Sequence, residues 1–370
     1  MAKSQKGHKY VSGVLLFCLV LLLLLLSTLV GAMLSYSYVR RVQENLKNPR
    51  EIEIQASKRM YVNIANGSST RAIAETLEKE GLIEYPQLFR ILSKVNGYDG
   101  LYQPGTHIVS EDLSYEELMM VLITEPEIVR LTFPEGLNSR QIYDAMSKSK
   151  LANGADVGKY IRGARESDFT DFAFLYGLPQ RQEYLEGYLF PDTYDFDLNA
   201  PPKTIVETLL KNFGRKIPDE YYRRAQELGM SMDEIVILAS VIEREAKDEA
   251  DRFMISGVFH NRLSSDDESM RRLQSCATIQ YIFYQRNGIM LRQISDSDTR
   301  VADPYNTYAH AGLPPGPICN PGISSINAAL YPDTTDYMFF VARGDGTHQF
   351  SRTYEEHQAA IEQYGLNLLP

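Results

Sequence analysis

Residues 10–33 are the feature that most limits how this chain can fold. The run carries no charged residue, and its leucines from Leu21 to Leu26 follow one another without a break. A helix of about 20 apolar residues crosses the hydrocarbon core of a bilayer, so this run is long enough to span a membrane. No second run of this length follows, which predicts a single-pass protein.

The residues around the run predict its orientation. Three lysines precede it, and an excess of positive charge favours the cytoplasmic side. We therefore expect residues 1–9 to be a cytoplasmic tail and 10–34 to be an anchor in the cytoplasmic membrane, with everything after about residue 40 outside. A cleaved signal peptide is the alternative, with Val30-Gly31-Ala32 as a weak cleavage site. The apolar run is, however, longer than the core of a normal signal peptide.

Length and composition exclude several classes of protein. At 370 residues the chain is too long for one ordinary core, so we expect two or three domains. A net charge of −10 does not fit the basic surface on which nucleic-acid binders depend, so we predict no nucleic-acid partner. Cys18 lies in the apolar run, which leaves Cys276 and Cys319 for one disulfide at most.

Two hydrolase classes are also disfavoured. The six histidines show no His-Glu-x-x-His pattern of a metallohydrolase. The chain has no Gly-x-Ser-x-Gly motif of a serine hydrolase, and Ser240 lies within an expected core helix. We predict no bound metal and no cofactor.

A small mixed module is predicted at 58–125, after a polar stalk at 35–57. Its pattern indicates a strand at 60–64, helices at 70–80 and about 85–95, an extended stretch at 102–109 and a helix at about 114–124. The strand–helix–helix–strand order resembles the LysM-type carbohydrate-binding module, whose fold binds N-acetylglucosamine chains. A purely structural spacer is the alternative.

Residues 126–370 are predicted to form a larger mixed domain. Strands are expected at 127–133, 337–342 and 348–350, and helices at about 141–148, 202–214, 219–228, 276–286, 323–330 and 353–363. We expect 185–194 to be an ordered loop whose aromatic rings could also stack on sugars. The predicted fold class is therefore α+β: a transmembrane helix, a LysM-like module, and a mixed domain with a central helix and a small C-terminal sheet.

The central helix is expected over about 232–247. Ser231 and Glu234 form a capping-box pattern at its start. Apolar residues then recur at the three- and four-residue spacing of one buried face, and a neighbouring antiparallel helix is expected at 249–263.

Two carboxylates, Glu243 and Glu245, close the central helix. At about 100° per residue they lie on opposite shoulders of its apolar face. A carboxylate at the edge of such a face is partly desolvated, which raises its pKa toward the range that a general acid needs at neutral pH. The alternative is a solvated run of charges without chemistry.

The segment 301–322 is too rich in Pro and Gly for regular structure. A long loop of this kind is costly to order, so we expect it to form the wall of a binding groove rather than a linker.

Several segments together point to one family. In chain order they are LEGYLFPDTY, LASVIEREA, VFHNRL, RLQS, YNTY, GLPPGPICNPG and YMFFVARGDGTHQF. With them the chain resembles the YceG-like (MltG-type) endolytic murein transglycosylases over nearly its whole length. The family commonly has Asp-Pro after Leu-Gln-Ser/Thr, where this chain has Cys276-Ala277, so any role of that Asp is absent here.

The resemblance implies a bacterial, membrane-anchored lyase that acts on peptidoglycan. It would cleave the β-1,4 bond between N-acetylmuramic acid and N-acetylglucosamine inside nascent glycan strands and leave 1,6-anhydromuramyl ends, without water. One Glu would act first as acid and then as base. We predict Glu245, because the catalytic Glu of similar enzymes precedes a small residue, as Glu245 precedes Ala246. Glu243 would support it or bind substrate.

Nine further residues on the matching motifs are candidates for binding the glycan or its peptide stem: Asn261, Arg262, Gln274, Tyr305, Asn306, Thr307, Tyr308, Pro314 and Asn320. The polar groups would hold N-acetyl and hydroxyl groups, and Arg262 would pair with a stem carboxylate. Ordinary structural hydrogen bonding, or for Arg262 a pair with a helix carboxylate, is the alternative.

The implied partners are glycan strands and the cytoplasmic membrane, and the family suggests a complex with wall synthases. The alternative function is a non-catalytic glycan-binding scaffold that recruits wall-synthesis proteins. That alternative leaves the paired carboxylates and the long Pro/Gly loop unexplained.

Overall fold

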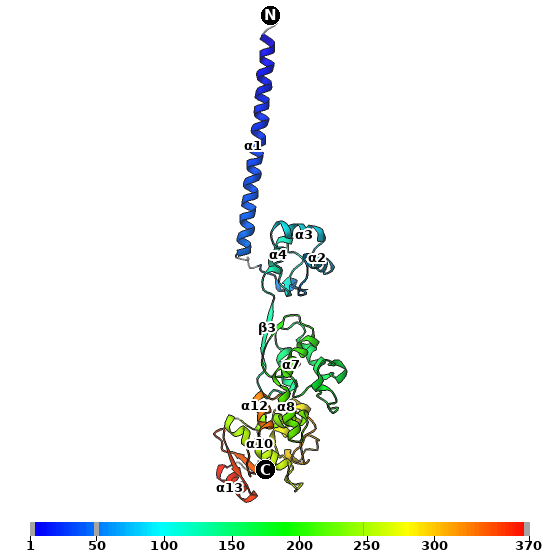
Figure 1. Ribbon diagram of the computed structural model, residues 1–370, viewed down its shortest axis with the longest axis vertical. Coiled ribbons are helices and arrows are strands. Elements are labelled where there is room, and N and C mark those ends of the chain that lie inside the picture. The colour runs from blue at the N-terminus through cyan, green and yellow to red at the C-terminus, as the bar shows by residue number, and fades with distance from the viewer. Residues whose placement is uncertain (1–3, 48–51, 247, 366–370) are drawn as a thin grey trace. The chain divides into compact units, whose positions relative to one another are not determined.

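The computed structural model describes residues 4–47, 52–246 and 248–365 (Figure 1). The chain divides into two compact units, Met1–Glu127 and Ile128–Pro370. Both units mix helices with small two-stranded sheets, which confirms the α+β class predicted from the sequence. Residues 1–3 of the predicted tail, 48–51 of the predicted stalk and Lys247 at the predicted end of the central helix lie outside the described residues.

Helix α1 (Ser4–Lys47) contains the apolar run. Within the described residues its segment Leu16–Arg41 is the one helical stretch long and apolar enough to cross a membrane, with a mean hydropathy of 2.8. The apolar part of this segment is not buried within the protein. The helix continues past residue 34, so the polar residues after the predicted anchor extend it by several turns.

The rest of the first unit is a strand–helix–helix–strand module followed by one helix. After a short 3₁₀ turn (Ala56–Lys58), its elements are β1 (Met60–Ile64), α2 (Thr70–Lys79), α3 (Pro86–Val95), β2 (Gly105–Val109) and α4 (Tyr115–Ile123). β1 and β2 pair antiparallel, with Met60 opposite Val109, so the two ends of the module meet in one sheet. Buried side chains such as Leu77, Phe89 and Leu118 fill its core.

The described part of the second unit combines helices with two antiparallel strand pairs. Its elements are β3 (Ile128–Thr132), α5 (Ser139–Ser147), α6 (Gly154–Arg162), β4 (Thr193–Asp197), α7 (Pro202–Lys216), α8 (Asp219–Glu227), α9 (Met232–Glu245), α10 (Glu249–Leu263), α11 (Cys276–Asn287), α12 (Ile323–Leu330), β5 (Phe339–Ala342), β6 (His348–Ser351) and α13 (Tyr354–Tyr364). β3 pairs antiparallel with β4, and β5 with β6. The small C-terminal sheet predicted from the sequence is therefore present.

Two elements of this unit differ from the sequence expectation. The loop expected at 185–194 runs into strand β4, whose Tyr194 and Phe196 are buried on one face. Its pairing partner β3 is far away in the sequence, and such a distant partner leaves little trace in a local pattern. Helix α6 is also not predicted. It contains Gly158, where an added Cβ would lie 1.7 Å from the ring of Tyr143, so close packing against α5 accounts for this glycine.

Helix α9 is the centre of the second unit, as predicted. The capping box is present, with the Ser231 hydroxyl accepting from Glu234 N–H and the Glu234 carboxylate accepting from Ser231 N–H. Every residue from Ile235 to Ile242 is buried, so the helix is enclosed on all sides. Its main packing partner is α12, which comes much later in the chain, although α10 also contacts it.

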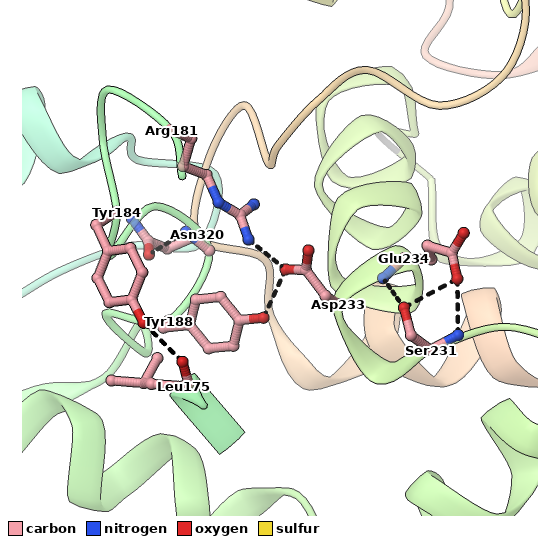
Figure 2. A network of polar contacts seen from close by, with 9 residues as sticks. Leu175, Arg181, Tyr184, Tyr188, Ser231, Asp233, Glu234 and Asn320 are labelled. Atoms are coloured by element: carbon pink, nitrogen blue, oxygen red, sulfur yellow. Dashed lines mark hydrogen bonds and ion pairs between the residues drawn. The ribbon is translucent and has the colours of Figure 1, made fainter. Parts of the chain in front are cut away.

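A buried ion pair anchors the start of α9 (Figure 2). Asp233 Oδ1 accepts hydrogen bonds from Arg181 Nη2 and from the Tyr188 hydroxyl, both at 2.7 Å. Because the Arg181 side chain is 2% exposed and that of Asp233 is 12% exposed, solvent screens this pair only weakly. The segment 181–190 is thereby fixed to the first turn of α9.

The loop 301–322 is irregular, as predicted, and its end packs along α9. Ile318 N–H donates to the Ser240 hydroxyl at 3.0 Å, and Cys319 Sγ donates to the Ser240 carbonyl at 3.3 Å. Cys319 and Cys276 are both free thiols, so the disulfide considered from the sequence is not formed. Gly187 has a φ of 91°, and an added Cβ there would lie 2.6 Å from Pro317, so only glycine fits at this contact between the segment 185–190 and the loop 301–322.

A fully buried carboxyl connects this loop to helix α5. Glu186 Oε1 accepts from Ser139 N–H at 2.9 Å and from Asn320 Nδ2 at 3.2 Å. Burial, and next the charge of Glu183, raise the pKa of Glu186 to about 8. The folded protein therefore holds a proton at this site under conditions in which the unfolded chain does not.

We predict that Leu238→Ala lowers the free energy of unfolding by about 2–5 kcal/mol, because it leaves a cavity in a helix that is enclosed on all sides. Leu238 is 0% exposed. The matched control, Ile289→Ala, removes a side chain that is 58% exposed and should change stability by less than about 0.5 kcal/mol. Urea unfolding of the full-length protein in detergent measures both, and equal losses would contradict a central role for α9.

We also predict that Glu186 makes the protein less stable as pH rises. The pKa of this group is near 4.5 in the unfolded chain and about 8 when folded, so between these values the folded state binds the extra proton. The contribution of this group to stability is therefore highest below about pH 4.5, falls as pH rises and levels off above about pH 8. The total loss is on the order of a few kcal/mol. Glu186→Gln should flatten this dependence in unfolding measured at several pH values. A variant with the slope of the wild type would show that Glu186 ionises normally.

Candidate active site at the end of helix α9

The carboxylate of Glu245 lies where α9 ends and α11 begins. Glu245 is the last residue of α9, and Ala246 leaves the helix with extended backbone. Its Oε1 accepts a hydrogen bond from the Ser275 hydroxyl, and the Ala277 N–H also donates to the carboxylate. Ser275 is the N-cap residue of α11 and Ala277 lies in its first turn. The positive end of α11 therefore faces the carboxylate.

Burial is the largest influence on the proton affinity of Glu245 and raises the pKa of its carboxyl above the ordinary value. The Ser275 hydroxyl, the nearby His348, the Ala277 N–H and the Arg244 charge oppose this rise without cancelling it. The side chain is still partly accessible to solvent. The group thus combines a raised proton affinity with donors already placed to hold its anion, which are the properties of an acid that later acts as a base.

Glu243 lies in different surroundings. Its Oε2 accepts from the Gly322 N–H at 3.1 Å, at the start of α12, and its Oε1 lies 3.9 Å from Nη2 of Arg252 on α10. The Glu243 side chain is 7% exposed and that of Arg252 is 8% exposed. These contacts tie the end of α9 to α10 and α12 next to Glu245.

The turn before Ser275 has an uncommon backbone. Among the described residues, Gln274 is the one non-glycine with a positive φ, at 52°. A glutamine in this region carries a conformational cost, and such costs are often found at functional sites. Gln274 N–H donates to the Thr307 carbonyl at 3.1 Å, and Ser275 N–H donates to the Thr307 hydroxyl at 3.0 Å. Thr307 thus holds the turn that directs Ser275 toward Glu245.

Arg262 supports the same turn from the other side. Its Nε donates to the Met270 carbonyl at 3.1 Å, and its Nη2 donates to the Arg272 carbonyl and to Gln274 Oε1, the latter at 2.6 Å. Burial lowers the pKa of Arg262 to about 10, so it remains charged at neutral pH. Within the described residues Arg262 donates to carbonyl and amide oxygens and forms no ion pair, and its pairing with a stem carboxylate stays a prediction.

Three amides predicted to bind substrate are engaged within the protein. Asn306 donates to two carbonyl oxygens of its own loop, both at 2.8 Å, and Asn261 donates to two carbonyl oxygens before β5. Asn320 donates to the Leu137 carbonyl at 2.9 Å and accepts from two backbone N–H groups of segment 187–189. These bonds shape the loops around the site, and glycan binding by these amides stays a prediction.

The aromatic candidates lie next to the turn. The Tyr308 hydroxyl is 3.1 Å from Cys276 Sγ, and the Tyr305 ring packs 5.1 Å from that of Tyr281. Both Tyr305 and Tyr308 keep part of their surface exposed, whereas Pro314 is buried. The two tyrosines are therefore more accessible to a ligand than Pro314, and binding of a sugar by any of the three stays a prediction.

Sequence reasoning did not single out Ser275 or His348. His348 begins β6. Its ring Nδ1 lies 3.0 Å from Asp251 Oδ2, and its backbone N–H donates to the same oxygen at 2.6 Å. The sequence signal for Ser275 is its position just before the helix at Cys276, which is an N-cap position. His348 has no comparable local signal, because only the hairpin brings it near Glu245.

No three His, Cys, Asp or Glu side chains lie close enough together to hold a metal ion in the part of the chain that the structure describes. The absence of a metal and of a cofactor stays a prediction.

Known proteins resemble the chain over most of its length. The family model described as the YceG-like family matches residues 62–363. An endolytic murein transglycosylase of Bacillus subtilis (strain 168) is 31% identical over 330 residues, which cover 85% of this chain and 87% of the relative. One from Streptococcus pneumoniae serotype 2 is 27% identical over 355 residues, which cover 90% of this chain but 62% of that longer protein. A crystal structure of a yceG-like protein from Listeria monocytogenes matches with a TM-score of 0.54 and 31% identity, over 82% of this chain and 99% of that one.

Proposed function

Because this chain belongs to the YceG-like family, we propose that it is a lytic transglycosylase of the bacterial cell wall. Its relatives in Bacillus and Streptococcus are named endolytic murein transglycosylases, which supports peptidoglycan as the substrate. The bond cleaved would be the β-1,4 bond between N-acetylmuramic acid and N-acetylglucosamine within nascent strands. The observation that carries the proposal is the buried carboxyl of Glu245 facing the first turn of α11.

In the first step, Glu245 acts as the acid. Its neutral carboxyl donates the proton to the glycosidic oxygen, the bond from that oxygen to C1 breaks, and positive charge develops at C1. Burial raises the pKa of Glu245 above its ordinary value, which favours the protonated form that this step needs. Glu243 is less suited to this step, because its contacts to Gly322 and Arg252 hold it against α12 and α10.

In the second step, the same carboxylate acts as the base. It takes the proton of the sugar's C6 hydroxyl while that oxygen forms a bond to C1, which closes the 1,6-anhydro ring. The proton returns to Glu245 and no water is consumed. Between the steps, the Ser275 hydroxyl and the Ala277 N–H stabilise the anion, and they are in place before the reaction begins.

We assign the surrounding residues to substrate binding and positioning. Tyr305 and Tyr308 would stack on sugar rings, since both residues are partly exposed. Gln274 and Thr307 hold Ser275 and would also meet the glycan where it passes Glu245. Arg262 fixes the turn and is more suited to positioning than to direct contact.

The remaining parts would bring the enzyme to its substrate. We propose that 58–125 is a LysM-like glycan-binding module, supported by the order β1–α2–α3–β2. The α1 helix would anchor the protein in the cytoplasmic membrane, with its N-terminus in the cytoplasm and the domain at 126–370 outside. Wall synthases are the partners we expect there, because they produce the nascent strands.

The test compares wild type, Glu245→Gln and Glu243→Gln, each full-length in detergent, on uncrosslinked glycan strands. Mass spectrometry should find ends about 18 Da lighter than hydrolysed ends, because no water is added. Glu245→Gln should lose at least about a hundredfold in rate, since it removes the acid and base. Glu243→Gln should be reduced but active.

Each other outcome has a defined meaning. Loss of cleavage in Glu243→Gln alone would move the acid to Glu243. If wild type produces hydrolysed ends, the protein is still an enzyme that cleaves glycan, but it uses water and the proposed mechanism is wrong. If wild type binds strands and cuts none, the protein is a glycan-binding scaffold.

A second prediction concerns pH. The Ser275 hydroxyl lowers the pKa of Glu245, so Ser275→Ala should raise that pKa further. An enzyme that depends on a general acid loses activity as pH rises through the pKa of that acid. Because the pKa is higher in Ser275→Ala, the alkaline limb of its kcat/KM profile should lie at higher pH than in wild type. The rate at the optimum should fall about tenfold or more, because the anion loses a charge-assisted hydrogen bond. Ser264→Ala, an exposed serine at the end of α10, is the control, and an unmoved limb in Ser275→Ala would refute the contact's role.

A further inference from the structure

A second polar cavity of the Ile128–Pro370 unit lies beside the far end of α11. It has a volume of about 180 Å³ and is enclosed by α5, α6, the segment 182–183 and Gln285 of α11. A water molecule occupies about 30 Å³ of liquid, so the cavity has room for a small charged group. The mechanism proposed for Glu245 uses none of its residues.

A buried carboxylate, that of Glu183, lines the cavity. Glu183 is 8% exposed, and no described residue donates a hydrogen bond to its side chain or forms an ion pair with it. Burial raises the pKa of Glu183, while the charges of Arg162 and Arg140 oppose that rise. The hydroxyl of Ser139, on the same cavity, is also buried without a hydrogen-bond partner.

Two arginines, Arg140 and Arg162, line the same cavity, and other contacts hold both in place. Arg140 Nη1 donates to the Tyr284 carbonyl at 2.9 Å and to the Gln285 carbonyl at 3.2 Å. The Arg162 guanidinium lies 4.8 Å from the centre of the Tyr143 ring. Within the described residues neither arginine forms an ion pair, so the cations and the Glu183 carboxylate face one cavity without meeting.

The unpaired charges of both signs in this lining select the chemistry of a ligand. A simple cation would meet two arginines, and a simple anion would meet Glu183. A group with an ammonium and a carboxylate on the same carbon suits both kinds of charge, because each of its charges can turn toward its opposite. The free end of an amino acid has this arrangement.

The cavity is connected to Glu245 along helix α11. Ala277 donates to Glu245, and Gln285 lines the cavity, eight residues further along α11. At about 1.5 Å per residue the two positions are about 12 Å apart. Between them, Gln280 and Tyr281 line a smaller cleft together with Arg244, the neighbour of Glu245. One face of α11 therefore leads from the site of cleavage to the charged cavity.

We propose that this cavity binds the free zwitterionic end of a murein stem peptide, with its ammonium toward Glu183 and its carboxylate toward Arg140 and Arg162. The inference rests on the proposed function, since it takes peptidoglycan as the substrate. Cross-linking acylates the stem amine and so removes its charge, and an acylated amine cannot pair with Glu183. The cavity would thus restrict cleavage to strands whose peptides are not yet linked.

The test measures binding and cleavage by the full-length protein in detergent. The binding probe is a disaccharide tripeptide that ends in meso-diaminopimelate, compared by calorimetry with the same molecule acetylated on its free amine. Wild type should bind the free-amine form about ten- to a hundredfold more tightly, the range expected for a charge-assisted hydrogen bond. Glu183→Gln should bind both forms equally. Arg162→Gln should no longer distinguish the free carboxylate from its amide.

Matched controls are Glu220→Gln and Arg223→Gln, which change exposed residues of α8 and should keep the wild-type preference. Thermal unfolding of each variant checks that it folds. Equal binding of both probes by wild type, or a preference retained in Glu183→Gln, would overturn the proposal.

Cleavage of strands with free or acetylated stems separates this inference from the proposed function. If wild type prefers the free-amine probe but cuts no strand, the proposed function fails and the cavity's specificity stands. If wild type cuts both strand types at the same rate and binds both probes equally, the proposal for the cavity fails, whereas the proposed transglycosylase function stands.

Discussion

The contact between the end of α9 and the start of α11 is the interaction on which the site depends. It places a buried carboxyl against an N-cap hydroxyl and the first N–H groups of a helix. Burial alone would favour a permanently neutral acid, and the donors alone would favour a permanent anion. The two influences together leave Glu245 able to hold a proton and also to release it. A residue that must serve as both acid and base needs this balance.

The rest of the unit keeps that contact in place. Arg262 and Thr307 hold the turn at Gln274 from two sides, in a backbone conformation that glutamine rarely adopts. Asp233, paired with Arg181 and Tyr188, anchors the other end of α9 (Figure 2). Both ends of the helix are therefore fixed by polar contacts, while its middle is fixed by apolar burial. Such a site can present its acid with little reorganisation.

The loop 301–322 shows which structural features a sequence pattern predicts and which it does not. The Pro/Gly-rich segment 301–322 is irregular, as its composition predicts, and its Thr307 contacts the turn before Ser275. Its Asn306 looks like a substrate-binding amide in the sequence, yet its amide donates to the carbonyl oxygens of Thr299 and Val301. A long loop without regular structure must satisfy its own carbonyl groups, and buried asparagines do so here. Composition therefore predicted that the loop is irregular, but not which side chains would be free for a ligand.

The sequence by itself determined the apolar anchor candidate, the capping and burial of α9, and the two carboxylates at its end. These features depend on local periodicity and on residue chemistry, which a linear pattern records. Tertiary structure gave the two carboxylates different surroundings, because Glu243 meets Gly322 and Arg252 while Glu245 meets Ser275 and Ala277. It also brought Glu183, Arg140 and Arg162 to the lining of one cavity, and paired β4 with β3. The proton affinity of a side chain is set by what surrounds it in three dimensions, and those neighbours come from distant parts of the chain.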